Sequence, residues 1–115
     1  LPCNAAKADL AIPSATQNEI NKETAEQLVA NGVFLVCEGA NMPSTNEASE
    51  IYHANKLLYG PAKAANACGV AVSGLEMSQN SIRLSWTREE VDAKLLGNIQ
   101  NIFKNCAETA EEFGA

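Results

Sequence analysis

The organisation of this chain is decided by one stretch, Val33-Phe34-Leu35-Val36-Cys37-Glu38-Gly39-Ala40-Asn41-Met42-Pro43. Its first five residues are apolar and rich in branched and aromatic side chains, which is typical of a buried strand. The remainder is small and polar and ends at a proline, which indicates a loop. Ligand-binding parallel sheets are built from strands that end in such loops, and the same pattern recurs on both sides of this stretch.

A similar strand and loop come first in the chain. Residues 9–13 form a short apolar run that ends at proline, and residues 14–18 are polar. Asn21 is placed to cap a helix over residues 22–31, and Gly32 is placed to end it. The order strand, loop, helix, strand predicts two parallel strands joined by a helical crossover.

The pattern repeats after the central loop. Ser44 and Glu47 have the spacing of a capping box, which predicts a helix that ends near Asn55. A third, short strand is predicted at residues 57–59. The sequence therefore predicts three parallel strands with a helix after each of the first two.

The C-terminal half of the chain is predicted to be helical. Small residues dominate residues 62–80, which suits a helix packed closely against another backbone. Thr87 and Glu90 form a second capping box, and apolar residues follow at helical spacing as far as Phe113. The predicted fold class is α/β, with a partial doubly wound, Rossmann-like parallel sheet followed by long helices.

Composition excludes several classes of protein. A chain of 115 residues has room for one domain, and 46% hydrophobic with 19% charged residues is an ordinary globular composition. Fourteen acidic and eight basic residues give a net charge of −6, and the basic residues are scattered, so no nucleic-acid partner is expected. The longest apolar run is far shorter than the roughly 20 residues of a membrane span, so no membrane segment is expected.

The cysteines suggest free thiols. They are far apart, form no C-x-x-C pair and share the chain with one histidine, so neither a metal site nor a disulfide framework is predicted. Buried thiols in a reducing compartment, the cytoplasm, are the interpretation. Because the chain starts at Leu1 without methionine, both ends are interpreted as cuts in a longer polypeptide. The cysteines are Cys3, Cys37, Cys68 and Cys106.

Three loops, at residues 15–18, 39–43 and 65–69, each combine amide side chains with small residues. They follow successive parallel strands, so they are expected at the same edge of the sheet. Amides donate and accept together, as a ribose hydroxyl or a nicotinamide carboxamide requires. Asparagine and glycine are also ordinary loop residues, which is the favoured interpretation for any single loop. Three such loops at one edge favour a binding site.

Three segments that contain these loops carry a family resemblance. They are Pro13-Ser14-Ala15-Thr16-Gln17-Asn18-Glu19, Glu38-Gly39-Ala40-Asn41-Met42-Pro43 and Asn66-Ala67-Cys68-Gly69-Val70-Ala71-Val72-Ser73-Gly74-Leu75-Glu76-Met77. These segments resemble successive motifs of the hexameric, NADP-type glutamate dehydrogenases. The resemblance continues through residues 78–86 into the long helix, so it covers nearly the whole chain in order.

The resemblance implies an enzyme that oxidatively deaminates L-glutamate to 2-oxoglutarate and ammonia with NADP, with NAD as the alternative cofactor, and catalyses the reverse amination as a homo-hexamer. It also implies two sets of binding residues, in which Asn41 and Asn66 face the nicotinamide ribose and Ser73 hydrogen-bonds the glutamate side-chain carboxylate. The implied cofactor-binding residues are Ala15, Gln17, Asn18, Asn41 and Asn66, and the substrate-binding residues are Asn66, Gly69, Val70 and Ser73.

The chain also departs from the family pattern. Its glycines never fall as G-x-G-x-x-G, and the family's catalytic lysine segment and aspartate have no match, so no catalytic residue is assigned and the chain alone is expected to be inactive. Residues 1–80 are interpreted as the C-terminal part of a dinucleotide-binding domain, and residues 81–115 as helices leading back toward a substrate domain. The alternatives are a branched-chain or aromatic amino-acid dehydrogenase, against which Ser73 argues, and a non-catalytic nucleotide-binding module.

Overall fold

The computed structural model describes residues 6–114. The chain divides into two compact units, Leu1–Asn66 and Ala67–Ala115. This division lies before the boundary expected between residues 80 and 81. That boundary refers to the domains of a longer enzyme and stays a prediction.

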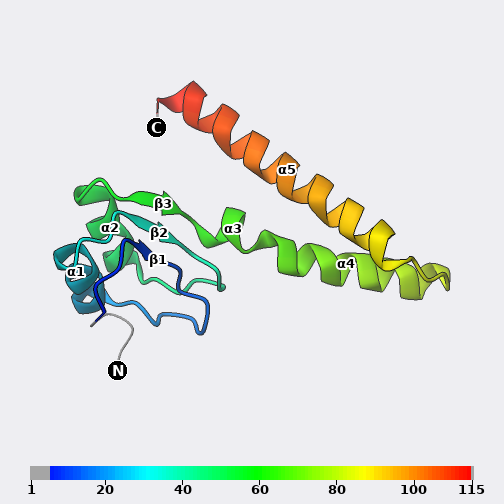
Figure 1. The fold of residues 1–115 in the computed structure, drawn as a ribbon, viewed down its shortest axis with the longest axis horizontal. Helices are drawn as coiled ribbons and strands as arrows, with labels where there is room; N and C mark the ends of the chain where they lie inside the picture. Colours follow the sequence, from blue (N-terminus) through cyan, green and yellow to red (C-terminus); the bar gives the residue numbers. More distant parts are fainter. Residues whose placement is uncertain (1–5, 115) are drawn as a thin grey trace. The chain divides into compact units, whose positions relative to one another are not determined.

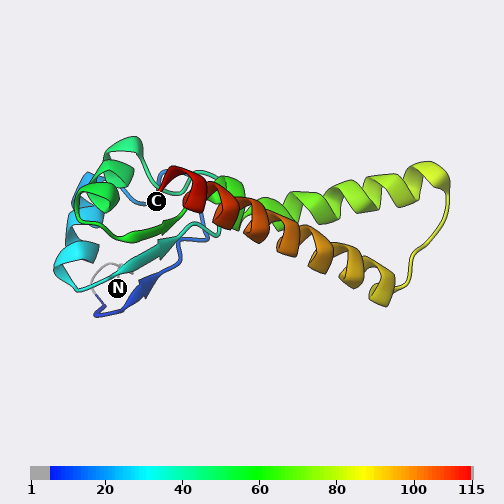
Figure 2. The same ribbon diagram turned by 90° about the horizontal axis from the view of Figure 1, so that it is seen from above.

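The first unit contains a sheet of three parallel strands in the order β1-β2-β3. The strands are β1 (Leu10–Ala11), β2 (Leu35–Cys37) and β3 (Leu58–Gly60). The crossover helices α1 (Lys22–Ala30) and α2 (Asn46–Ala54) pack together on the same face of the sheet (Figures 1 and 2). The predicted α/β class, with a partial parallel sheet of Rossmann type, is confirmed.

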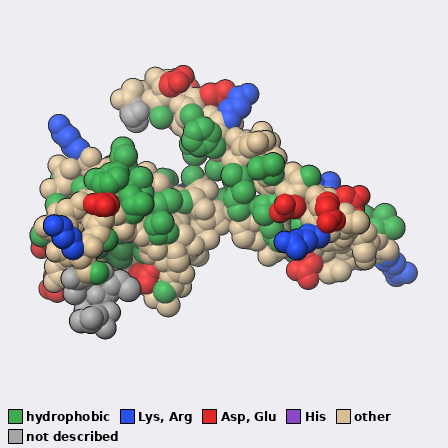
Figure 3. Space-filling model, viewed as in Figure 1, with side chains coloured by type: hydrophobic (Ala, Val, Ile, Leu, Met, Phe, Trp, Pro, Cys, Tyr) green, Lys and Arg blue, Asp and Glu red, His purple; other side chains and the backbone are tan. Residues whose placement is uncertain are grey.

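The core of this unit lies between the sheet and the two helices. The register places Ala11, Val36 and Tyr59 in one row across the strands, facing α1 and α2, and Val36 is completely buried there. The adjacent row points away from the helices, and its Leu10 and Leu58 are 49% and 61% exposed. Figure 3 shows hydrophobic side chains gathered over the strands. The described part of the sheet is therefore buried on one face, with apolar side chains on the other.

The termini of α1 agree with the sequence. The Asn21 side chain accepts a hydrogen bond from Thr24 N. Gly32 has a φ of 89° and donates to Val29 O, while Val33 N donates to Leu28 O, which is the hydrogen-bond pattern of a Schellman motif. The predicted cap and stop of this helix are confirmed.

The predicted capping box of α2 is wrong by one residue. Thr45 is the N-cap, and its side chain accepts from Ala48 N. The Ser44 hydroxyl lies 3.1 Å from the Tyr52 hydroxyl instead. The hydroxyl of a buried tyrosine needs a hydrogen-bond partner. The Ser44 hydroxyl, which the sequence predicts as the helix cap, is therefore used by Tyr52 instead.

The single helix predicted over residues 62–80 is also wrong, because the structure has two. A short α3 (Ala62–Ala65) ends at Asn66, and α4 (Ala67–Ile82) begins after it. The second unit consists of α4 and α5 (Arg88–Phe113), which form a helical hairpin (Figure 1).

The start of α5 confirms the second capping box. Thr87 Oγ1 accepts from Glu90 N, and the Glu90 carboxylate accepts from Thr87 N at 2.7 Å. Across residues 6–114, none of the helices combines the length and apolar character needed to cross a membrane.

Candidate functional site

The loops that follow β1 and β2 are joined backbone to backbone. Each loop leaves the carboxyl end of its strand, and hydrogen bonds then connect the two along much of their length. Such bonds hold both loops in one conformation before any ligand arrives. They run from Asn18 N to Met42 O, from Ile20 N to Pro43 O, from Thr45 N to Ile20 O and from Gly39 N to Pro13 O, each 2.9 or 3.0 Å long.

Asn66 fastens the end of α3 to the central loop. With its amide oriented as its neighbours require, Asn66 donates from Nδ2 to Gly39 O at 3.2 Å and accepts at Oδ1 from Asn41 N at 3.3 Å. The loops bearing Asn18, Asn41 and Asn66 therefore meet at one end of the sheet. We call these three residues and their loops the amide edge.

Two residues of the amide edge have left-handed backbone. Asn18 has a φ of 56° and Met42 a φ of 50°, and their main chains are hydrogen-bonded to each other. Asparagine tolerates this conformation, but methionine is rarely found in it. Such residues persist where the surrounding structure determines them, and they cluster at binding and catalytic sites. This geometry favours a preformed ligand site at the amide edge.

Gly39 allows the first two loops to approach closely. A Cβ added to Gly39 would collide with the Ser14 hydroxyl and would lie 3.5 Å from Ile12 Cγ2. The Ser14 hydroxyl donates to Ile12 O at 3.0 Å, so it could turn away from a new Cβ only by breaking this hydrogen bond. The spacing of the loops therefore depends on the missing side chain at Gly39.

A buried polar group lies beneath the amide edge. Glu38 is 4% exposed, and its Oε2 accepts from Ala62 N at 2.8 Å. Burial raises the pKa of Tyr52, the hydrogen bond with Ser44 lowers it, and the negative charge of Glu38 raises it. Glu38 is not among the residues predicted from the sequence, although a carboxylate directly after a buried strand is the signal that could have identified it.

Tyr59 belongs to the same group of side chains. Burial raises the pKa of Tyr59, hydrogen bonding with Ser49 lowers it, and hydrogen bonding to Glu38 raises it. Its ring centroid lies 5.4 Å from that of Tyr52. Both tyrosines are therefore held in the protonated form by their surroundings.

Alkaline pH should destabilise this group. Because the folded pKa of both tyrosines is raised above the ordinary value of 10.0, their contribution to stability is complete below that pH and is lost as pH rises through the folded values. The chain has two tyrosines, so its tyrosinate absorbance reports on this group alone. We expect a midpoint above 10.0 in the folded chain and a lower midpoint in urea. Equal midpoints would contradict the assignment.

The structure brings together only part of the predicted site. Asn18, Asn41 and Asn66 meet at the amide edge, and Ala15 and Gln17 are exposed in the same loop as Asn18. The other predicted substrate residues lie on α4, in the second unit. Their roles toward a ligand stay predictions. Those residues are Gly69, Val70 and Ser73, all exposed on α4.

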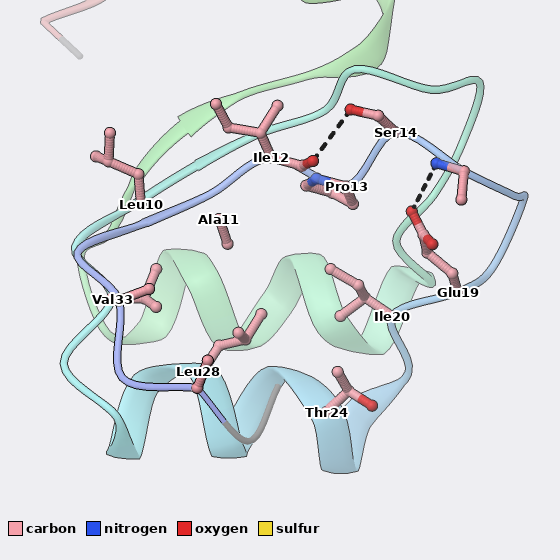
Figure 4. A pocket seen from close by; sticks show the side chains of 13 residues that line it. Leu10, Ala11, Ile12, Pro13, Ser14, Glu19, Ile20, Thr24, Leu28 and Val33 are labelled. Atoms are coloured by element: carbon pink, nitrogen blue, oxygen red, sulfur yellow. Dashed lines mark hydrogen bonds between the residues drawn. The ribbon is translucent and has the colours of Figure 1, made fainter. Parts of the chain in front are cut away.

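A cavity of about 650 Å³ lies beside β1 and α1. Figure 4 shows apolar side chains on its walls, among them Leu10, Leu28 and Val33. Of the predicted cofactor residues only Ala15 reaches it. The cavity lacks the amide side chains of the amide edge, so it does not contribute to the candidate site.

The expectation of buried cysteine thiols is wrong for the described residues, because Cys37 and Cys68 are half-buried and Cys106 is exposed. Cys37, Cys68 and Cys106 are free thiols, and Cys3 lies outside the described residues. Within residues 6–114, no three His, Cys, Asp or Glu side chains are grouped so that they could hold a metal ion.

Comparison with known proteins identifies the family. A family model described as "Glutamate/Leucine/Phenylalanine/Valine dehydrogenase" matches residues 2–115. The chain is 56% identical over 112 residues to an NADP-specific glutamate dehydrogenase of Giardia intestinalis, covering 97% of this chain and 25% of that protein. It is 59% identical over 106 residues to a glutamate dehydrogenase of Bacteroides thetaiotaomicron, covering 92% and 24%.

Solved structures agree with the sequence relatives. The crystal structure of Plasmodium falciparum glutamate dehydrogenase matches with a TM-score of 0.84 and 50% identity, covering 96% of this chain and 24% of that chain. The chain thus spans about a quarter of the length of the relatives it matches. The match of the family model along residues 2–115 shows that this chain belongs to the glutamate/leucine/phenylalanine/valine dehydrogenase family.

Proposed function

We propose that this chain is part of a longer enzyme that oxidatively deaminates L-glutamate to 2-oxoglutarate and ammonia with NADP and catalyses the reverse amination. The observation that carries the proposal is the amide edge, a preformed meeting point of three loops at the carboxyl ends of parallel strands, where such folds bind their ligands. The 56% identity to a relative named an NADP-specific glutamate dehydrogenase supports this choice of reaction and cofactor.

The amide edge has the chemistry that the nicotinamide end of NADP requires. Gln17, Asn18 and Asn41 are exposed amides that can donate to and accept from ribose hydroxyls and a carboxamide. Asn66 uses one N–H and one oxygen lone pair within the protein, which leaves one of each for a ligand. When bound, NADP accepts the hydride. The residues of this chain hold and orient it, and Ala15 leaves room for a flat ring beside the loop.

On the substrate side, Gly69 and Val70 border the glutamate and Ser73 donates to its side-chain carboxylate. The Ser73 hydroxyl now donates to Gly69 O at 3.4 Å, a long hydrogen bond that is readily exchanged for a charged acceptor. A hydroxyl donor suits glutamate and has no partner on the side chain of leucine, valine or phenylalanine.

Replacing Ser73 with alanine tests glutamate specificity. In the full-length protein, Ser73→Ala is expected to raise the glutamate KM by about 10-fold or more, because a hydrogen bond to a charged group is lost. The KM of norvaline, which lacks the carboxylate, should change by less than about threefold. Equal changes for both substrates would favour the branched-chain or aromatic amino-acid dehydrogenase.

The proposed enzyme is a homo-hexamer of the cytoplasm, in agreement with the family resemblance and with free thiols. Its catalytic groups lie in parts of the protein beyond this chain, and its choice of NADP over NAD is set there as well. The full-length protein should therefore reduce NADP when glutamate is added, and the isolated 115-residue chain should not. Full-length protein that binds NADP without turnover would favour the non-catalytic module, and sustained turnover by the isolated chain would contradict the assignment of catalysis elsewhere.

A further inference from the structure

Glu38 is a buried carboxylate for which the proposed reaction gives no role. It directly follows β2 and is 4% exposed. A buried charge is costly unless hydrogen bonds compensate it. Its Oε2 accepts from Ala62 N at 2.8 Å, and its main-chain N donates to Gly60 O at 2.9 Å. The two contacts thus reach the last residue of β3 and the first residue of α3.

The next helix, α3, is too short to be stable by itself. α3 spans Ala62–Ala65, and a single turn of helix is unstable without outside contacts. Glu38 holds its first residue, and the Asn66 amide holds its end against Gly39 O and Asn41 N. The helix is thus fastened at both ends to one short segment, residues 38–41.

Through α3, Glu38 influences the distance between Asn41 and Asn66. Asn41 lies three residues after Glu38, and Asn66 follows the last residue of the helix that Glu38 holds. An apolar side chain at position 38 could fill the same space, but it would leave Ala62 N without its acceptor. α3 would then be held to the segment through the Asn66 amide at its end but no longer through Glu38 at its start, so its position relative to Asn41 would be less tightly fixed.

We propose that Glu38 is a positioning residue of the cofactor site: by accepting the Ala62 N–H it fixes α3, and thereby holds Asn66 at the spacing from Asn41 that the nicotinamide ribose of NADP requires. The inference rests on the proposed function, because it assigns NADP to the amide edge. Glu38 acts through Ala62 and Asn66 and does not itself contact the cofactor.

The first test compares two variants of Glu38 in the full-length protein. Glu38→Ala is expected to raise the NADPH Kd by about 10-fold, the effect of one lost hydrogen bond to a charged group. Glu38→Gln keeps an oxygen that can accept from Ala62 N, so its Kd should remain within about threefold of the unmodified protein. Glu26→Ala, at an exposed position of α1, is the matched control and should leave the Kd unchanged.

The second test removes the donor and leaves Glu38 in place. Ala62→Pro deletes the N–H at the first position of a helix, where proline is favourable, and the ψ of 151° at Pro61 is compatible with a following proline. It should raise the NADPH Kd by about 10-fold, whereas Ala62→Ser, which keeps the N–H, should not. This pair remains informative if Glu38→Ala fails to fold.

The outcomes separate the two proposals. Kd values are measured by fluorescence titration with NADPH, well below the unfolding midpoint of each variant, so that a loss of stability alone leaves them unchanged. Unaltered NADPH affinity in folded Glu38→Ala or Ala62→Pro overturns the role of Glu38 and leaves the proposed function standing. Loss of affinity in Glu38→Gln as large as in Glu38→Ala also overturns it. Failure of the unmodified full-length protein to bind NADPH overturns both.

Discussion

Replacing Gly39 with alanine in the full-length protein is expected to lower its affinity for NADPH by about 10-fold or more. The new Cβ would collide with the Ser14 hydroxyl, which donates to Ile12 O. Rotation of the Ser14 hydroxyl would break its hydrogen bond to Ile12 O and would still leave Ser14 Cβ 3.3 Å from the new atom, so the loops must also shift by a few tenths of an ångström. Overpacking of this kind costs about 1–3 kcal/mol. The movement separates the loops that carry Asn18 and Asn41, so binding is lost together with stability.

Two further variants show whether the collision is the cause. Ser14→Gly removes the opposing side chain, so the double variant Ser14→Gly/Gly39→Ala should recover most of the NADPH affinity. Gly97→Ala is the matched control, because nothing lies within 4 Å of its added Cβ and Gly97 stands inside α5, where alanine is the better helix former. Normal NADPH affinity in Gly39→Ala, or additive effects in the double variant, would refute the close-approach explanation.

Local sequence signals predicted the first unit well. The Asn21 cap, the glycine stop at Gly32 and the parallel order of the strands all depend on residues that are close together in the chain. Alternating apolar and polar segments also predicted that the strands are joined by helical crossovers. These features follow from local propensity and from the geometry of parallel sheets.

The errors occurred where a side chain outside the short local motif decides the local structure. Ser44 has good capping chemistry, but Tyr52 occupies its hydroxyl and Thr45 becomes the cap. Residues 62–80 have the composition of one helix, but the Asn66 amide bridges to the loop at Gly39 and Asn41, and the helix is interrupted there. Tyr52 lies within α2 itself, but outside the short capping motif, and Gly39 and Asn41 lie far from Asn66 in the sequence.

In the candidate site, too, some features could be predicted from the sequence and others could not. The meeting of three loops could be predicted, because the carboxyl ends of parallel strands share one edge. The hydrogen bonds that each amide makes could not be predicted. Asn66, for example, uses one N–H and one oxygen lone pair within the protein and leaves the others for a ligand. The buried Glu38 was overlooked for a similar reason, because its partner Ala62 N lies 24 residues away.

Replacing Tyr52 with alanine is expected to be the most damaging single change to the fold of the first unit. Tyr52 is completely buried and packs with the side chains of both helices and the central strand, including Leu28 and Val36. Truncating a buried aromatic residue costs about 3–5 kcal/mol. A unit of this size has a total stability of roughly 3–10 kcal/mol at about 0.05–0.15 kcal/mol per residue. The variant should therefore lose most or all of the cooperative structure of this unit.

Hydrogen exchange of the peptides that span α1 and α2 measures this loss directly, since protection there depends on packing against the sheet. Tyr52→Phe is the matched control: it keeps the ring and loses only the hydrogen bond to the Ser44 hydroxyl, which is worth about 1 kcal/mol. Protection should collapse in Tyr52→Ala and fall modestly in Tyr52→Phe. If both variants exchange alike, the hydroxyl pair with Ser44 stabilises the unit more than ring packing does. The shift of the α2 cap from Ser44 to Thr45 would then follow from the same strong interaction.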